Sequence, residues 1–239
     1  MGSLLDALLN LIFPVKSGCP LCGYRGKPEG LCSRCLEWLE GWRKLPKCCL
    51  CGKPLAPAEM EKHRCVFCGR DAPPFAMAMA AGPYQGYLKE AIHLLKYRGR
   101  KVLAPLLAEL MIKVIRSNGH FSQVLAVVPV PASAQRIRER GFNQAELLAR
   151  YIARELKLPL LSHAVVKKLE TPHQTGLSRE ERQQNLREAF AIADPSEVYG
   201  KSVLIIDDVF TTGFTAAALA EALLAAGAGP VYVATAARG

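Results

Sequence analysis

Two adjacent acids, Asp207 and Asp208, follow a run of aliphatic residues in the segment VLIIDDVFTTGFT (203–215). A short turn containing Thr211, Thr212 and Gly213 comes next, and a helical pattern begins directly after it. The free backbone N–H groups and the dipole of a helix N-terminus attract a phosphate, and glycine lets the backbone approach it closely. Carboxylates beside the phosphate can accept hydrogen bonds from vicinal hydroxyls. A ribose 5-phosphate carries both groups, so the segment predicts a site for such a ligand.

Two other interpretations of this segment are weaker. GKS (200–202) precedes it, as in a nucleotide-binding P-loop, but the upstream position that needs glycine is Pro195. GKS also leads into a strand pattern, whereas a P-loop lysine leads into a helix. The other interpretation is a chance grouping of acids at a strand end. The combination of aliphatic run, paired acids and hydroxyl-rich turn argues against it.

The cysteines predict metal sites. Eight of the nine form four C-x-x-C pairs within fifty residues, and none lies beyond residue 68. In a reducing compartment such pairs bind zinc, because two thiolates on one tight turn can face a tetrahedral ion at about 2.3 Å. Redox chemistry is the alternative for an isolated pair, but four pairs favour two structural zinc sites. The predicted ligands are Cys19, Cys22, Cys32, Cys35, Cys48, Cys51, Cys65 and Cys68.

The residues around the pairs predict their local structure. CPLCG, CLCGK and CVFCG place a glycine after the second cysteine, where a zinc knuckle needs a residue that tolerates positive φ. CSRCLEWLEGW runs instead into a helical pattern. We therefore expect a knuckle plus a helix start from the first two pairs, and a ribbon of paired knuckles from the last two. Neighbouring pairs are expected to share one zinc, and an interleaved pairing stays open. Cys49 and His63 are expected to be bystanders.

The charge and hydropathy of the chain indicate which classes of partner it could bind. The formal net charge of +10, from 31 Lys and Arg against 21 Asp and Glu, favours a polyanionic partner. Two zinc sites would lower it to about +6, because eight thiolates add −8 and two ions add +4, so charge alone is a weak argument for DNA binding. No run reaches the roughly 18 apolar residues of a membrane-spanning helix. SLLDALLNLIFPV (3–15) is expected to form a short amphipathic helix, and the protein is expected to be cytoplasmic.

Strand and helix patterns alternate beyond the proline-rich segment DAPPF (71–75). Continuous aliphatic runs such as 124–130, 203–208 and 231–237 are typical of buried parallel strands, and 143–156 and 215–227 have helical spacing. The alternation predicts an α/β fold with an open, mostly parallel sheet and helices on both faces. Ligands of such sheets bind beyond the carboxyl ends of the strands. We expect a zinc-binding module over 1–70 and an α/β domain over 71–239, with separate cores.

The segment 203–215 resembles the phosphoribosyl-pyrophosphate (PRPP) motif of type I phosphoribosyltransferases. The whole chain resembles the ComF/GntX family through its cysteine-rich start and through HLLKYRGR (93–100), VVPVPAS (127–133), RIRERGFNQAELLAR (136–150) and TPHQTGLSREERQQNLREAF (171–190). This resemblance implies a double zinc-ribbon-like module joined to a phosphoribosyltransferase-like domain. It also implies binding of PRPP with Mg²⁺, and an association with DNA uptake in natural transformation.

The resemblance implies roles for individual residues. Asp207 and Asp208 would bind the ribose hydroxyls, and the 5-phosphate would be held by Thr211, Thr212, Gly213, Phe214 and Thr215. The loop that faces pyrophosphate would contain Pro129, Val130, Pro131 and Ser133. A segment that closes over the site would contribute Thr171, Gln174 and Asn185, although a solvated helix face is the other interpretation there. The cations that stabilise the leaving pyrophosphate would be Arg140, Arg179 and Arg182. Relatives in purine salvage carry an acid where this chain has Thr211, which argues against a hypoxanthine- or guanine-type acceptor.

Three functions follow from these observations: a phosphoribosyltransferase with an unknown acceptor, a PRPP sensor without turnover, and a single-stranded-DNA-binding competence factor. The basic segment KEAIHLLKYRGRK (89–101) bears on the choice. Its cations and tyrosines could contact phosphates and stack on bases, or the segment could be a hood helix over the PRPP site. Its candidate nucleic-acid contacts are Lys89, Lys96, Tyr97, Arg98, Arg100 and Lys101.

Overall fold

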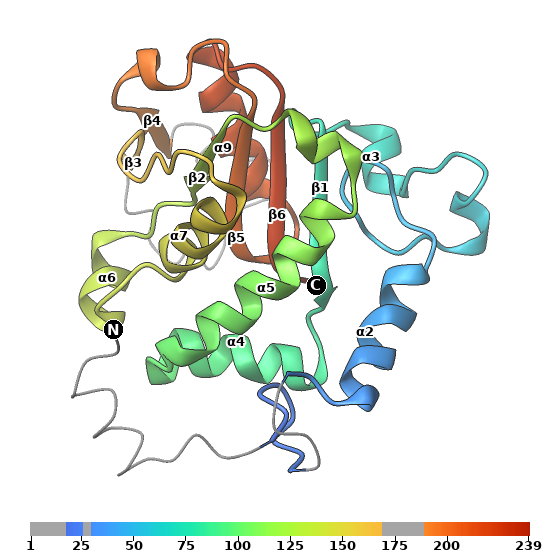
Figure 1. The fold of residues 1–239 in the computed structure, drawn as a ribbon. Coiled ribbons are helices and arrows are strands. Elements are labelled where there is room, and N and C mark those ends of the chain that lie inside the picture. The colour runs from blue at the N-terminus through green and yellow to red at the C-terminus, as the bar shows by residue number, and fades with distance from the viewer. Residues whose placement is uncertain (1–17, 26–29, 169–188) are drawn as a thin grey trace, which may run out of the picture.

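A parallel four-stranded sheet in the order β1-β6-β5-β2 forms the centre of the protein (Figure 1). The computed structural model describes residues 18–25, 30–168 and 189–239. The strands of the sheet are β1 (Met77–Pro83), β2 (Ala126–Pro129), β5 (Val203–Phe210) and β6 (Val231–Arg238). A separate antiparallel pair consists of β3 (Val165–Lys167) and β4 (Phe190–Ile192). The expected mostly parallel α/β sheet is confirmed.

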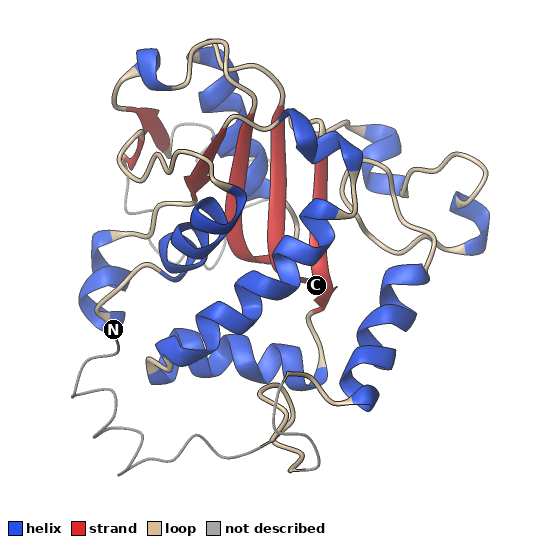
Figure 2. Ribbon diagram, viewed as in Figure 1, coloured by secondary structure: helices blue, strands red, loops and turns tan. Residues whose placement is uncertain are grey.

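Helices cover both faces of this sheet (Figure 2). In the view of Figure 1, α5 (Ala104–Arg116) and α7 (Gln144–Leu156) lie in front of the sheet and α9 (Phe214–Ala225) lies behind it. The other α-helices among the described residues are α2 (Ser33–Lys44), α3 (Val66–Arg70), α4 (Gly86–Arg98) and α6 (Ala134–Arg140). Short 3-10 helices span Pro57–Glu59, Lys101–Leu103, Gly119–Gln123 and Pro195–Glu197. No helix within the described ranges has the length and apolar character needed to span a bilayer.

The aliphatic runs are explained by burial on both faces of the sheet. In β5, Leu204 and Ile206 pack in the cluster that contains α5 and α7, whereas Val203 and Ile205 pack in the cluster that contains α9. Successive side chains of a strand point to opposite faces, so a strand covered on both sides must be apolar at every position. The run ends at Asp207, directly after Ile206, the last residue of β5 that pairs with β2, while β5 continues beside β6 to Phe210.

The cysteine-rich part packs directly on this sheet. Cys32 and Cys35 belong to the same buried cluster as α5 and α7, and Cys51 belongs to the cluster of α9. The backbone N–H of Ala78 in β1 donates to the carbonyl of Leu50 at 2.7 Å, so the third cysteine pair extends the edge of the sheet. The expectation of separate cores is therefore wrong. The predicted boundary near residue 71 falls between α3 and β1 and stays a prediction.

Candidate functional site

The eight paired cysteines form two tetrads, each made of two neighbouring pairs. Within each tetrad the Sγ atoms lie within 4.8 Å of one another, and the Cys22–Cys32 and Cys51–Cys65 Sγ distances are both 3.6 Å. Thiolates at about 2.3 Å from a tetrahedral ion are about 3.8 Å apart, so both tetrads fit a zinc ion. The interleaved pairing is excluded. We name them the first tetrad (Cys19, Cys22, Cys32 and Cys35) and the second tetrad (Cys48, Cys51, Cys65 and Cys68).

Each tetrad combines a knuckle with the start of a helix. Gly23 and Gly52 follow the knuckles with φ of 74° and 68°, as predicted. Cys32 and Cys65 are the N-cap residues of α2 and α3. The predicted knuckle at the fourth pair is wrong, because Gly69 lies inside α3. A helix start can replace a knuckle here, because both provide backbone N–H groups that donate to the thiolates.

The backbone prepares these thiols for metal binding. Burial raises the pKa of the Cys48 thiol, but backbone N–H donors, chiefly those of Cys51 and Cys65, outweigh it and bring the pKa to about 7. The pKa of Cys19 is about 6, because backbone donors there also outweigh the effect of burial. Burial has the larger effect at Cys35, Cys51 and Cys68 and raises the pKa of these thiols. Within each tetrad one thiol therefore ionises more readily than its neighbours, and the thiolate is the form that binds metal.

The acid pair lies at the carboxyl end of β5 and has a cation of its own. Asp208 is 3% exposed, and the ammonium of Lys96 lies 2.6 Å from its Oδ2. Apart from this ion pair, Asp208 Oδ2 accepts no hydrogen bond from the described residues. Asp207 Oδ1 accepts from the backbone N–H of Asp208 at 2.8 Å. Asp207 is partly exposed and can offer acceptor atoms to a ligand, whereas Asp208 Oδ2 is buried against Lys96.

Burial and nearby cations act in opposite directions on these groups. Burial raises the pKa of Asp207 to about 6, although the charges of Lys96 and Arg136 act to lower it. Burial also lowers the pKa of Lys96 to about 8, with Asp207 opposing that change and Arg140 adding to it. Perturbed groups that share a partly buried location are typical of functional sites.

The loop after β2 lies beside the acid pair. Pro129 is in register with Ile206, and the N–H of Val130 donates to the carbonyl of Ile206 at 2.9 Å. Ser133 caps α6, its Oγ accepting from the N–H of Arg136 at 3.3 Å. The loop predicted to face pyrophosphate and the predicted ribose-binding acids are thus brought to the same edge of the sheet, together with the cations of α6.

The turn after β5 leaves the N-terminus of α9 without a side-chain cap. Thr211 and Thr212 are exposed, and Gly213 has φ of 85°. A Cβ at Gly213 would lie 2.6 Å from the ring of Phe210, so both the conformation and the space require glycine. Phe214 and Thr215 begin the helix. The first N–H groups of a helix have no acceptor within the helix, so a helix start of this kind suits an anion.

The basic segment divides into an inner and an outer part. Lys96 turns inward to Asp208, and its side chain is only 16% exposed, so it is not available at the outer surface. The exposed candidates are Lys89, Tyr97, Arg98, Arg100 and Lys101. The inward direction of Lys96 could have been read from the sequence, because it lies four residues after the buried Ile92 and beside Leu95 on the apolar face of α4.

Three aromatic rings with a cation at each end lie along the outer part of this segment and include neighbours from outside it. His93 Nε2 and the Tyr84 hydroxyl are 2.9 Å apart, and the rings of His93 and Tyr97 are 5.3 Å apart. The guanidinium of Arg140 lies 5.1 Å from the Tyr97 ring, and the ammonium of Lys89 lies 5.8 Å from the Tyr84 ring. Arg140 also donates to Gln144 Oε1 at 3.0 Å. We call this set (Lys89, Tyr84, His93, Tyr97 and Arg140) the aromatic ladder.

Several predicted site residues lie outside the part of the chain that the structure describes. Arg179, Arg182, Thr171, Gln174 and Asn185 lie outside the described residues, as does the expected helix near the start of the chain. Two cations near the site were not selected from the sequence. Arg136 precedes Arg140 in the same basic helix and affects Asp207, and Arg238 at the end of β6 contacts the turn after β5. The three arginines of RIRER (136–140) were a usable signal for the first, and no sequence signal marked the second.

Comparison with other proteins agrees with this geometry. Residues 139–239 match the phosphoribosyl transferase domain family. The chain is 33% identical over 208 residues to the DNA utilization protein YhgH of Salmonella typhimurium, covering 85% of this chain and 88% of that protein. It is 32% identical over 191 residues to Competence protein F of Haemophilus influenzae, covering 78% and 81%. Identity to Competence protein ComFC of Bacillus subtilis is 29% over 216 residues, covering 87% and 72%. The chain therefore belongs to the ComF family and carries a phosphoribosyl transferase domain.

Proposed function

We propose that this protein binds PRPP with Mg²⁺ at the carboxyl end of β5 and acts in DNA uptake or utilisation. The observation that carries the proposal is the buried acid pair, which lies among Lys96, Arg136 and Arg140 and precedes an uncapped helix N-terminus. PRPP has phosphates at both ends of a ribose, and this site offers groups for each part. The names of the relatives, which refer to competence and DNA utilisation, support the cellular process.

The ribose 5-phosphate end would be held by the turn and the start of α9. The backbone N–H groups of residues 213–215 and the hydroxyls of Thr211 and Thr212 would donate to the phosphate oxygens. The ribose 2- and 3-hydroxyls would donate to Asp207 and Asp208. The positive charge of Lys96 lies 2.6 Å from Asp208 Oδ2, and it acts to lower the pKa of Asp207 against the effect of burial.

The pyrophosphate end would face residues 129–133 and the cations of α6. Carboxylate oxygens are the hard donors that Mg²⁺ prefers, and Asp208 Oδ2 is buried with Lys96 as its one charged partner in the described structure. Asp207 and Asp208 therefore fit a magnesium ion that is also bound by the ligand's own oxygens. When bound, the ion would neutralise charge on the pyrophosphate group.

A transferase reaction at this site needs no protein nucleophile. The bond from the anomeric carbon to pyrophosphate breaks, a bond from that carbon to the acceptor forms, and pyrophosphate leaves with the electron pair. Arg140 and Arg136 would stabilise the charge that develops on the leaving group. We propose a phosphoribosyltransferase-like reaction with an unassigned acceptor. PRPP sensing without turnover is the alternative, and it predicts binding without release of pyrophosphate.

Calorimetric titration with PRPP and Mg²⁺ tests the proposal. Asp207→Asn combined with Asp208→Asn should weaken binding at least about tenfold, or about 1.4 kcal/mol, because the ribose hydroxyls lose their acceptors. The control is Glu37→Gln with Glu61→Gln, which makes the same change in charge at exposed positions and should bind like wild type. Equal affinity of the site variant and wild type would show that the acids do not hold the ribose.

A second candidate function, binding of single-stranded nucleic acid, is favoured by the aromatic ladder. Successive rings at 5 to 6 Å can stack with bases, and Arg98, Arg100 and Lys101 lie exposed nearby to contact phosphates. Fluorescence anisotropy of a labelled oligonucleotide would detect this activity. No binding at moderate salt would leave the segment as a hood over the PRPP site.

The cysteines support two further proposals, two structural zinc ions and a cytoplasmic location. Both tetrads fit zinc, and none of the nine cysteines forms a disulfide, which is typical of a reducing compartment.

A further inference from the structure

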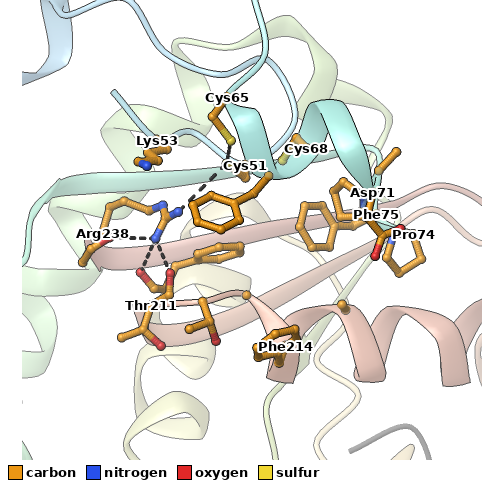
Figure 3. A pocket seen from close by; sticks show the side chains of 18 of the residues that line it. Cys51, Lys53, Cys65, Cys68, Asp71, Pro74, Phe75, Thr211, Phe214 and Arg238 are labelled. Atoms are coloured by element: carbon orange, nitrogen blue, oxygen red, sulfur yellow. Dashed lines mark hydrogen bonds between the residues drawn. The ribbon is translucent and has the colours of Figure 1, made fainter. Parts of the chain in front are cut away.

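Arg238, the last residue of β6, lies between the second tetrad and the turn after β5 (Figure 3). Its Nη1 donates to the carbonyls of Phe210 at 3.0 Å and of Gly239 at 2.8 Å, and also to the carbonyl of Thr211. Its Nη2 is 4.0 Å from Cys51 Sγ. One guanidinium group thus contacts a predicted metal ligand with one nitrogen and the backbone of the turn with the other.

The same side chain also fixes the ring on which the turn rests. The guanidinium of Arg238 lies 4.6 Å from the centroid of the Phe210 ring, within the range of a cation–π contact. The tip of this ring is close to Gly213, where an added Cβ would lie 2.6 Å from Phe210 Cζ. Arg238, Phe210 and Gly213 therefore form a continuous set of contacts from the second tetrad to the N-terminus of α9.

The guanidinium of Arg238 is partly buried, and the second tetrad lies on one side of it. Its Nε is buried and has no acceptor among the described residues, and the three carbonyls around Nη1 are neutral. A zinc ion with four thiolates carries a formal charge of −2, whereas a tetrad of thiols carries none. Loading of the second tetrad would therefore place a negative charge beside Arg238 and favour the position in which its Nη2 lies 4.0 Å from Cys51 Sγ.

The first tetrad has no such link. It packs on the other face of the sheet, with α5 and α7, and no hydrogen bond or ion pair joins it to the turn among the residues that the structure describes. Beside the second tetrad, a pocket of about 640 Å³ reaches Cys51, Cys65, Cys68, Thr211, Thr212 and Arg238. Small molecules can therefore reach both the metal ligands and the turn.

We propose that Arg238 is a positioning residue through which a metal ion in the second tetrad holds residues 210–213 in the conformation that binds phosphate. The proposal rests on the proposed function in one respect, the role of this turn as the phosphate site. Loss of the metal would loosen the turn. Because coupling between two binding sites is reciprocal, a phosphate ligand on the turn would in return slow the loss of that metal.

The link between Arg238 and the metal is tested by zinc release from the full-length protein without any phosphate ligand. A chelator removes zinc while alkylation and mass spectrometry record which cysteines become reactive. In Arg238→Met, the cysteines of the second tetrad should become reactive about tenfold faster than in wild type, because loss of a residue that contacts a metal ligand commonly weakens metal binding by at least that factor. The rate for the cysteines of the first tetrad should not change. Lys53→Met is the matched control, because Lys53 lines the same pocket and lies over Phe67 but donates to no atom of the turn in the described structure.

If Arg238→Met does not fold, Arg238→Lys replaces it. Lysine keeps a positive charge but lacks the planar guanidinium that donates in two directions, so the cysteines of the second tetrad should become reactive about threefold faster than in wild type. Opening of the second tetrad at the same rate in the folded Arg238 variant and in Lys53→Met would overturn the proposal.

The link between the metal and the turn is tested by amide NMR, again without a phosphate ligand. Removal of zinc from the second tetrad of the wild type should shift the resonances of Thr211, Thr212 and Gly213. In Arg238→Met these resonances should already be shifted, and zinc removal should move them little further. Unchanged resonances in the wild type would refute the coupling. Failure of the proposed function is distinguishable, because it would appear as no binding of ribose 5-phosphate or PRPP while both of these ligand-free results hold.

Discussion

The ion pair between Lys96 and Asp208 provides the sharpest energetic prediction. Lys96→Met removes the charge but keeps a flexible apolar stem of similar length. The two side chains are only 16% and 4% exposed, so water cannot replace the lost cation at Asp208. Breaking a buried pair by removing one partner costs about 3 to 5 kcal/mol. We expect the lower figure, about 3 kcal/mol, because Arg136 also acts on the acid pair.

Urea unfolding at neutral pH, followed by circular dichroism, measures this loss. Lys89→Met is the control, because Lys89 lies on the same helix with an exposed side chain, and its free energy of unfolding should change by about 0.5 kcal/mol or less. Adding Asp208→Asn to Lys96→Met removes the uncompensated charge and should recover about 2 kcal/mol. Equal stabilities of Lys96→Met and Lys89→Met, or no recovery in the double variant, would show that Lys96 does not compensate a buried carboxylate.

Three further predictions concern the metals, pH and nucleic acid. Elemental analysis should find two zinc ions per chain, and Cys51→Ser should destabilise the α9 face of the sheet as well as residues before 71, since they share a core. Burial raises the pKa of Asp207 to about 6, so its contribution to stability is complete below its unfolded pKa of about 3.9 and is lost as pH rises through about 6. Without ligand, Asp207→Asn should therefore flatten the decline in unfolding free energy between about pH 4 and pH 6, and an unchanged profile would contradict this. The log–log salt dependence of binding to single strands should lose about two units of slope when Arg98, Arg100 and Lys101 become Ala. If the salt dependence is reduced instead in a variant with alanine at Arg34, Lys44 and Arg70, the nucleic-acid site lies on the cysteine-rich part.

The sheet and the position of the site could be predicted because their signals are local. A strand covered on both faces must be continuously aliphatic, so the runs ending near Val130, Asp208 and Ala237 marked three of the four strands. The acids that end one run, followed by Gly213, marked the turn that we propose as the phosphate site. The grouping of the cysteines also followed from their spacing, since neighbouring pairs are the ones a short chain can bring together.

The remaining features depend on contacts that local patterns do not contain. A glycine after a cysteine fits a knuckle, but Gly69 lies in a helix because Cys65 caps it. The cysteine-rich part was expected to fold apart from the sheet. In the structure, a Cβ added to Gly52 would lie 2.7 Å from the carbonyl oxygen of Ala78 in β1, so the two parts are in close contact there. No local sequence pattern indicates this contact. Arg238 is an ordinary terminal cation in the sequence, and its partners at Cys51 and Thr211 lie far from it along the chain.

A crystal structure of the complex with PRPP and Mg²⁺ tests the central claim most directly. We predict density for the 5-phosphate against the backbone N–H groups of residues 213–215, with the ribose hydroxyls on Asp207 and Asp208 and the pyrophosphate toward residues 129–133. Binding of PRPP elsewhere, for example at the exposed cations Arg98, Arg100 and Lys101 or in the pocket beside the second tetrad, would contradict the account.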